Sequence, residues 1–242
     1  MTGVQTCALP IYAALIIVGD TDYKDIEKKS ASLLKFNKKI IQTSNNYSYI
    51  NPKEMQIVLV EQEKTPQTYL MMGQVVCDAK NIKDMLALEM IKRIMASSPT
   101  SRLLANLRES KGWTYGVQSS LIPLVNKSAF TFTSSIQIPY GFDALNEILS
   151  EIKKMQNTLI SNEELTFAKN SVLGWFNDWY LSLDSSVETI SLAFLHDMHV
   201  GYESASYDIA NNIKAEDIQD VAKKYLSQER MIVIAVGDTE IM

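Results

Sequence analysis

The sequence predicts an α+β fold in which helices pack on one side of an antiparallel sheet. Short segments with strand character come in neighbouring pairs, and longer segments with a helical period follow them. This grouping is typical of α+β proteins, whereas α/β proteins alternate single strands and helices. The composition agrees with a globular fold, because 46% of the 242 residues are hydrophobic and 21% are charged.

An internal repeat links the two ends of the chain. Residues 14–22, Ala-Leu-Ile-Ile-Val-Gly-Asp-Thr-Asp, closely resemble residues 232–240, Ile-Val-Ile-Ala-Val-Gly-Asp-Thr-Glu. Each copy is an apolar run that ends in a Gly-Asp-Thr turn, which predicts a buried strand. A repeated strand implies a repeated domain. We therefore expect residues 12–50 to be the C-terminal remnant of a first domain with its linker, and residues 51–242 to be a complete second domain.

Residues 1–11 are interpreted separately. They have neither the basic start nor the continuous apolar stretch of a signal peptide. Their back-translation resembles a sequencing-library adapter, so we interpret them as a probable adapter-derived artefact; an unusual native N-terminus is the alternative.

Each later element follows from a local pattern. Alternating apolar residues predict strands, recurring apolar residues three or four positions apart predict helices, and Asn81 is placed to cap a helix. Capping boxes are predicted at Ser161 with Glu164 and at Ser185 with Glu188. The expected order is a helix over Tyr23–Phe36, a polar linker over 37–51, strands over Met55–Glu61 and Gln67–Val76, a helix over Ile82–Met95, a short helix ending at Gly112, strands over Thr114–Pro123 and Phe130–Ile138, a helix over Phe142–Met155, two capped helices, helices over Glu203–Asn211 and Ala215–Leu226, and the final repeat strand.

Charge and hydropathy exclude two classes of partner. The net charge is −5 and no basic stripe is present, which argues against nucleic-acid binding. No apolar run approaches the roughly 18 residues of a membrane-spanning helix, so no membrane partner is expected.

The strongest candidate for a functional site is the segment Leu107–Val117, Leu-Arg-Glu-Ser-Lys-Gly-Trp-Thr-Tyr-Gly-Val. Arg108 leaves the last turn of a predicted helix and Tyr115 enters a predicted strand, so the glycine turn can bring both side chains toward one point. A guanidinium and a phenol hydroxyl there could donate hydrogen bonds to a carbonyl oxygen that gains negative charge. The alternative is structural, with the arginine at helix-terminal carbonyls and the tyrosine packed against the strand.

The same residues carry a family resemblance. The Ser101-Arg102-Leu103 segment, Leu-Arg-Glu, Gly-x-Thr-Tyr-Gly-Val and the Val-Gly-Asp strand endings resemble the insulinase-like (pitrilysin-type) zinc metallopeptidases from about Tyr12 to the end of the chain. The resemblance implies duplicated α+β domains, of which the first holds zinc through His-x-x-Glu-His. The second supplies an arginine and a tyrosine seven positions apart. Arg108 and Tyr115 match that spacing, which implies that they contact the substrate or the transition state.

Two departures from the family limit what this chain does alone. No His-x-x-Glu-His occurs, so the chain is expected to need no cofactor of its own and to cleave no peptide by itself. Zinc is expected in an absent domain or a partner subunit, and the partners implied are that subunit and a peptide or protein substrate. The loop Ala96–Thr100 also lacks the family's glycines. A non-catalytic partner or scaffold subunit of the same family is the alternative function.

Two other groups of residues could suggest binding sites. His196 and His199 would share one face of a helix and could hold a metal with Asp197, but their spacing fits neither common zinc order, so we predict no metal site. Trp175, Trp179 and Tyr180 are expected to be core or domain-interface contacts.

Overall fold

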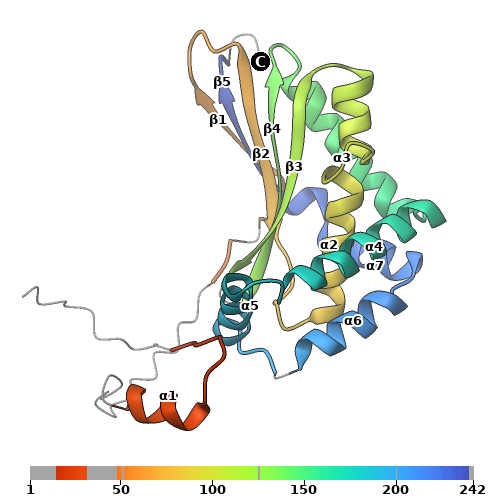
Figure 1. Ribbon diagram of the computed structural model, residues 1–242. Coiled ribbons are helices and arrows are strands. Elements are labelled where there is room, and N and C mark those ends of the chain that lie inside the picture. The colour runs from red at the N-terminus through yellow and green to blue at the C-terminus, as the bar shows by residue number, and fades with distance from the viewer. Residues whose placement is uncertain (1–14, 32–47, 51, 125, 200, 240–242) are drawn as a thin grey trace, which may run out of the picture.

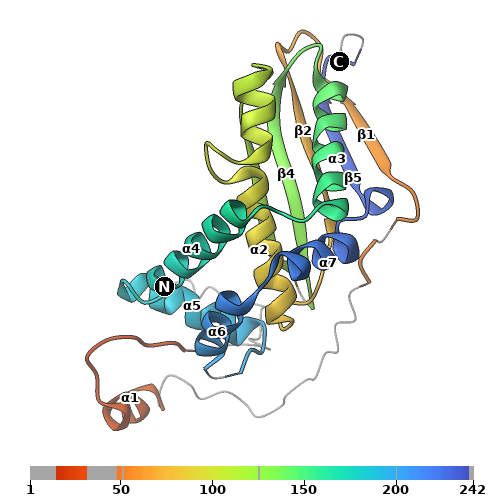
Figure 2. The same cartoon turned by 90° about the vertical axis from the view of Figure 1, so that its right-hand side faces the viewer.

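The computed structural model describes residues 15–31, 48–50, 52–124, 126–199 and 201–239, and it contains one five-stranded sheet with helices along one face (Figures 1 and 2). The strands are β1 (Gln56–Glu61), β2 (Gln67–Val75), β3 (Thr114–Leu124), β4 (Lys127–Gln137) and β5 (Ile232–Gly237), in the spatial order β1-β5-β2-β4-β3. The predicted α+β class, with helices on one side, is confirmed. The sheet is mixed rather than purely antiparallel, because β1 and β5 run parallel.

The described helices follow the predicted order, whereas the segment 1–11, the end of the first predicted helix (32–36) and residues 37–47 and 51 of the predicted linker lie outside the described residues. They are α1 (Tyr23–Ser30), α2 (Ile82–Ala96), the π-helix η1 (Leu104–Ser110), α3 (Gly141–Asn157), α4 (Asn162–Asp178), α5 (Leu183–Leu195), α6 (Tyr202–Asn212), α7 (Ala215–Tyr225) and the 3-10 helix η2 (Gln228–Arg230). Asn81 caps α2 as predicted, since its side chain accepts a hydrogen bond from the backbone N–H of Asp84. No described helix is both long enough and apolar enough to cross a membrane.

The core lies between the sheet and α2. Phe130 and Phe132 of β4 and Met72 of β2 point from the sheet toward the helices and are at most 1% exposed. α2 is buried on nearly all sides because it packs against β3, α4, α6 and α7. This central helix therefore connects the sheet to the rest of the helical layer.

The two copies of the repeat differ in structure. The second copy forms β5, which pairs with β1 on one side and β2 on the other. The prediction for the first copy was wrong over its described residues, because residues 15–22 contain no strand, and Leu15 and Ile17 are 50% and 44% exposed. A strand forms only when its backbone groups find partners, and no described strand pairs with these residues. Residue 14 lies outside the described part of the chain.

One of the two predicted capping boxes is displaced by a turn. Ser161 and Glu164 form the box at the start of α4 as expected. At α5 the box is formed by Ser182 and Ser185, not by Ser185 and Glu188. Ser182 has the extended backbone of an N-cap, so the helix begins at Leu183 and Glu188 lies inside it.

Candidate functional site

Arg108 and Tyr115 lie on two adjoining elements, η1 and β3, joined by a tight turn at Gly112. Gly112 has a φ of +67°, a left-handed conformation that favours glycine. The turn allows the Gly112 N–H to donate to the Arg108 carbonyl at 3.1 Å and the Trp113 N–H to donate to the Leu107 carbonyl at 2.9 Å. The glycine therefore lies just after the π-helix, which ends at Ser110, and leads the chain into the strand that carries Tyr115.

The turn itself is fixed to α3. The Trp113 ring stacks on Tyr140 with the centroids 4.9 Å apart and the planes 9° from parallel. The Lys111 ammonium lies 4.6 Å from the Trp113 ring centroid and forms an ion pair with Glu147. These contacts fix the segment between the two candidate residues to α3 and its N-cap.

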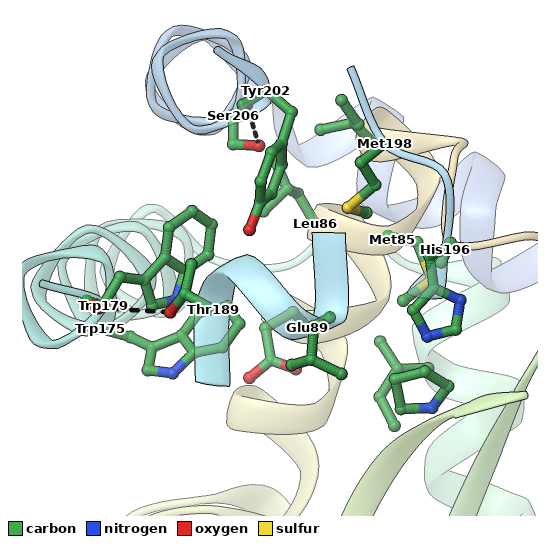
Figure 3. A pocket seen from close by; sticks show the side chains of 15 residues that line it. Met85, Leu86, Glu89, Trp175, Trp179, Thr189, His196, Met198, Tyr202 and Ser206 are labelled. Atoms are coloured by element: carbon green, nitrogen blue, oxygen red, sulfur yellow. Dashed lines mark hydrogen bonds between the residues drawn. The ribbon is translucent and has the colours of Figure 1, made fainter. Parts of the chain in front are cut away.

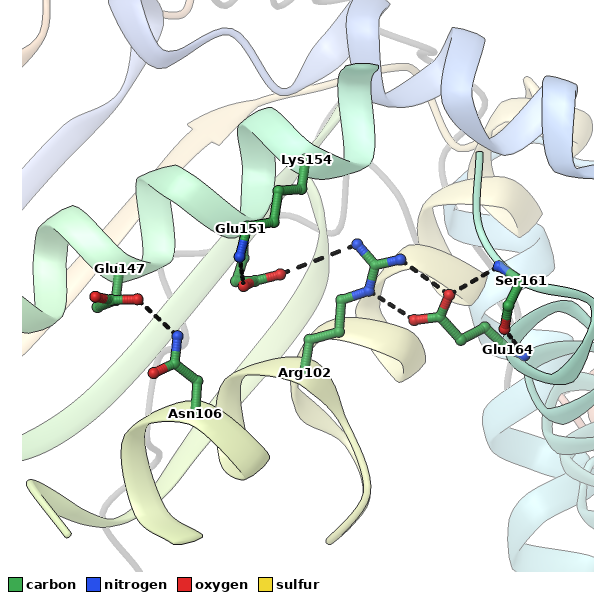
Figure 4. Close-up of polar contacts among 7 residues, drawn as sticks. All are labelled: Arg102, Asn106, Glu147, Glu151, Lys154, Ser161 and Glu164. Atoms are coloured by element: carbon green, nitrogen blue, oxygen red, sulfur yellow. Dashed lines mark hydrogen bonds and ion pairs between the residues drawn. The ribbon is translucent and has the colours of Figure 1, made fainter. Parts of the chain in front are cut away.

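Polar contacts anchor η1 to the helices behind it (Figure 4). Arg102, just before η1, donates two hydrogen bonds to the Glu164 carboxylate of α4, at 2.6 and 2.9 Å. Asn106 of η1 donates to Glu147 of α3 at 2.7 Å. The hydrogen bonds from Arg102 hold the pKa of Glu164 below its ordinary value. The helix that presents Arg108 is thus tied to both α3 and α4.

A β-bulge sets the direction of Tyr115. Thr114 pairs with Ile136 and Val117 with Ser134, so Tyr115 and Gly116 together face a single residue of β4. The Thr114 hydroxyl donates to the Ser135 carbonyl at 2.7 Å and accepts from the Gly116 N–H at 3.1 Å. Thr114 and Val117 are buried, whereas Tyr115 is 81% exposed. The bulge therefore turns the tyrosine away from the core.

The Arg108 guanidinium and the Tyr115 hydroxyl make few contacts with the rest of the protein. The Arg108 side chain is 49% exposed, and its Nε lies 3.4 Å from Oε1 of its neighbour Glu109. No hydrogen bond joins Arg108 to Tyr115 within the described residues. The structure places both at the same end of β3, where each side chain is largely exposed. Beside them, a shallow groove runs along the edge of β3 from Gly116, between the strand and the loop that follows α2.

The two histidines do not share a helix face, which corrects the prediction that they lie on a helix. α5 ends at Leu195, His196 is its C-cap, and Asp197 has a left-handed φ of +49°. Asp197 forms an ion pair with Lys80 at 2.7 Å, and His199 is exposed. Within the described ranges, no three histidine, cysteine or acidic side chains are grouped so that they could hold a metal.

The aromatic residues at the end of α4 and just after it have different surroundings. The Tyr180 hydroxyl donates to Glu203 at 2.5 Å, which ties the end of α4 to α6. Trp175 and Trp179 contact each other edge to face and line a pocket with Tyr202 of α6. Sequence reasoning missed this pocket and the Thr114 bulge, because their members come from segments far apart in the chain. The Thr-Tyr-Gly segment at the start of a strand was the only local signal for the bulge.

Comparisons with known proteins agree with this architecture. Residues 4–172 match the family described as Peptidase M16 inactive domain. No curated protein matched the chain. A crystal structure of a peptidase M16 inactive domain from Pseudomonas fluorescens is similar, with 20% identity, a TM-score of 0.72, and coverage of 79% of this chain and 45% of that one.

Two further solved structures share the fold. A protease from Helicobacter pylori has 16% identity and a TM-score of 0.79, and the match covers 90% of this chain and 54% of that one. A chain of complex III2 from Candida albicans has 14% identity and a TM-score of 0.76, with coverage of 90% and 53%. This chain therefore spans about half the length of each of the three structures.

The family match extends over more than half of the chain and includes both Arg108 and Tyr115. The fold, the sheet with helices on one face, is the one found in the solved relatives. The chain therefore belongs to the peptidase M16 family, as an inactive domain of the insulinase-like type.

Proposed function

We propose that this chain is the substrate-binding, non-zinc half of an insulinase-like metallopeptidase, and that Arg108 and Tyr115 contact the peptide during hydrolysis. The observation that carries the proposal is that both side chains are exposed and stand on backbone anchored to other elements, while Arg108 contacts only its neighbour Glu109. Groups held in this way can act on a ligand without reorganisation of the protein.

The zinc would belong to another domain or subunit. When bound there, it would activate a water molecule and polarise the scissile carbonyl. Arg108 and Tyr115 would donate hydrogen bonds to the carbonyl oxygen as it becomes negative, and the anchored η1 would keep the guanidinium in position. The groove along β3 leaves space for the rest of the peptide beside them.

Reconstitution with a cognate zinc-bearing domain tests the proposal. Arg108→Ala and Tyr115→Phe are each expected to lower kcat/KM by about a hundredfold or more, because loss of one oxyanion donor typically has this effect. Tyr115→Phe is the sharper variant, since it removes only the hydroxyl group. Steady-state hydrolysis of a fluorogenic peptide gives the measurement.

Matched variants separate a role in hydrolysis from a general effect on folding. Tyr207→Phe removes a hydroxyl from another exposed tyrosine, and Lys153→Ala removes an exposed cation on α3. Both are expected to retain full activity. Full activity of Arg108→Ala and Tyr115→Phe would contradict the proposal and leave only the architecture in common with the peptidases.

A second candidate function is that of a non-catalytic scaffold subunit. The observation that allows it is that a chain of complex III2 shares this fold with a TM-score of 0.76, as a protease from Helicobacter pylori does with 0.79. An intact His-x-x-Glu-His in the cognate partner would favour the peptidase, and a degenerate motif would favour the scaffold.

A further inference from the structure

An apolar pocket lies at the end of β3 opposite Tyr115. It has a volume of about 150 Å³, is partly open to solvent, and is lined by residues of α2, α4, α5, α6 and the last part of β3 (Figure 3). Trp175 and Trp179 form one wall and Met85 of α2 lies across from them. A cavity of this size holds a benzene-sized ring.

The hydroxyl of a mostly buried tyrosine points into this pocket. Tyr202 is only 7% exposed, and its hydroxyl projects between Trp179 and Glu89 (Figure 3). No described residue forms a hydrogen bond with that hydroxyl. Burial raises the pKa of Tyr202 to about 12, so the group remains a neutral phenol. The hydroxyl is not among the fully buried unpaired polar atoms of the described residues, so it remains accessible from the pocket and a ligand there could form a hydrogen bond with it.

The pocket offers no free carboxylate to a ligand. Glu89 is 6% exposed and is paired with two cations of its own helix, Lys92 at 2.6 Å and Arg93 at 3.1 Å. His196 lies at the C-cap of α5 and contributes its imidazole to the lining. With the acid already neutralised and the remaining walls mostly apolar, a neutral ligand is favoured over a charged one.

We propose that this pocket binds a small neutral aromatic compound that carries one hydrogen-bonding group. Its ring would lie against Trp175 and Trp179 and its polar atom would bond to the Tyr202 hydroxyl. The volume admits one ring rather than an extended peptide, which favours a small molecule over a peptide segment. This inference does not depend on the proposed peptidase role, because the pocket shares no residue with the Arg108 and Tyr115 site.

Calorimetric titration of the full chain with phenol tests the proposal, with benzene as the apolar comparison. Phenol is expected to bind saturably to one site and to alter the tryptophan fluorescence. Tyr202→Phe is expected to weaken the affinity for phenol about threefold to tenfold, the usual effect of losing one hydrogen bond. It is expected to leave the affinity for benzene unchanged. Tyr207→Phe, on the same helix but outside the lining, is the matched control and is expected to change neither.

A filling variant distinguishes the pocket from the remaining surface. Leu192→Trp places a larger side chain in the lining from α5 and is expected to abolish binding of both compounds while the thermal transition stays cooperative. The proposal fails if phenol binding does not saturate, or if Tyr202→Phe weakens the affinities for phenol and for benzene equally. It also fails if a zinc-bearing partner displaces phenol, because the natural occupant would then be a side chain of that partner.

Discussion

Glu164 shows how one side chain can support two parts of the site region. Its backbone N–H donates to the Ser161 hydroxyl at 3.1 Å, and its carboxylate accepts from the Ser161 N–H at 2.9 Å. The same carboxylate accepts both hydrogen bonds from Arg102, just before the helix that carries Arg108. The start of α4 and the start of η1 therefore depend on one charge.

The lowered pKa of Glu164 predicts an acid-sensitive contribution to stability. A carboxyl whose pKa is lower in the folded state stabilises the fold fully above its unfolded pKa, about 4.3, and the effect is lost as the pH falls through the folded value. Glu164→Gln keeps a capping oxygen but loses the charge. We expect it to lower the free energy of unfolding at pH 7 by about 1–3 kcal/mol, the usual contribution of a charged hydrogen bond.

Urea unfolding of Glu164→Gln between pH 7 and pH 3 measures this effect. The difference from the unmodified chain is expected to shrink as the pH drops below about 4.3. Glu163→Gln, in the same helical turn but exposed and without Arg102 as a partner, is the control and is expected to have little effect. A difference that stays constant with pH would show that the charge of Glu164 is not responsible.

At the scale of elements, the bulge in β3 decides where the candidate tyrosine points. In a regular strand successive side chains alternate between the two faces. One extra residue opposite Ser135 breaks this alternation, and the hydroxyls of Thr114 and Ser134 satisfy the backbone groups around it. The orientation of Tyr115 is therefore a property of two paired strands.

Thr114→Val should weaken the bulge. The substitution keeps the shape of the side chain but removes the hydroxyl that bonds to Gly116 and Ser135, and loss of buried hydrogen bonds costs about 1–3 kcal/mol. Thermal or urea unfolding measures the loss, and reconstituted activity is expected to fall as Tyr115 loses its fixed direction. Thr133→Val on β4, where the side chain makes no such bond, is the control. Equal stability of the two variants would contradict this role for Thr114.

At the scale of the whole molecule, β3 separates the two chemically interesting regions. Tyr115 is near its start, whereas Leu121 and His196 line the pocket near its end. Six residues of strand span about 20 Å. His196 is therefore too far from Tyr115 to supply a metal ligand to the same site.

This separation predicts that the purified chain carries no stoichiometric zinc and hydrolyses no peptide. A zinc site needs three or four ligands in one place, and such a cluster is absent from the described residues. Elemental analysis after dialysis, together with a peptidase assay, provides the measurement. One zinc per chain, lost in the His196→Ala and His199→Ala double variant, would contradict this prediction.

Patterns along the chain were sufficient to predict the order of the elements and the spacing of the candidate pair. Helix period, strand alternation and caps such as Asn81 and Ser161 act over three or four residues, so the sequence alone reveals them. The seven-residue spacing of Arg108 and Tyr115 is likewise local. Their exposure and anchoring could not be predicted, because Glu147, Glu164 and Ser135 come from segments distant in the sequence.

The repeat shows most clearly what only the tertiary structure decided. Residues 15–21 and 233–239 have similar apolar runs and the same Gly-Asp-Thr ending, yet among the described residues only the second copy forms a strand. The local sequence determined that both segments could adopt the extended conformation of a β-strand. The presence of β1 and β2 on either side determined which one did, because a strand is stabilised by hydrogen bonds to neighbours that its own sequence does not contain.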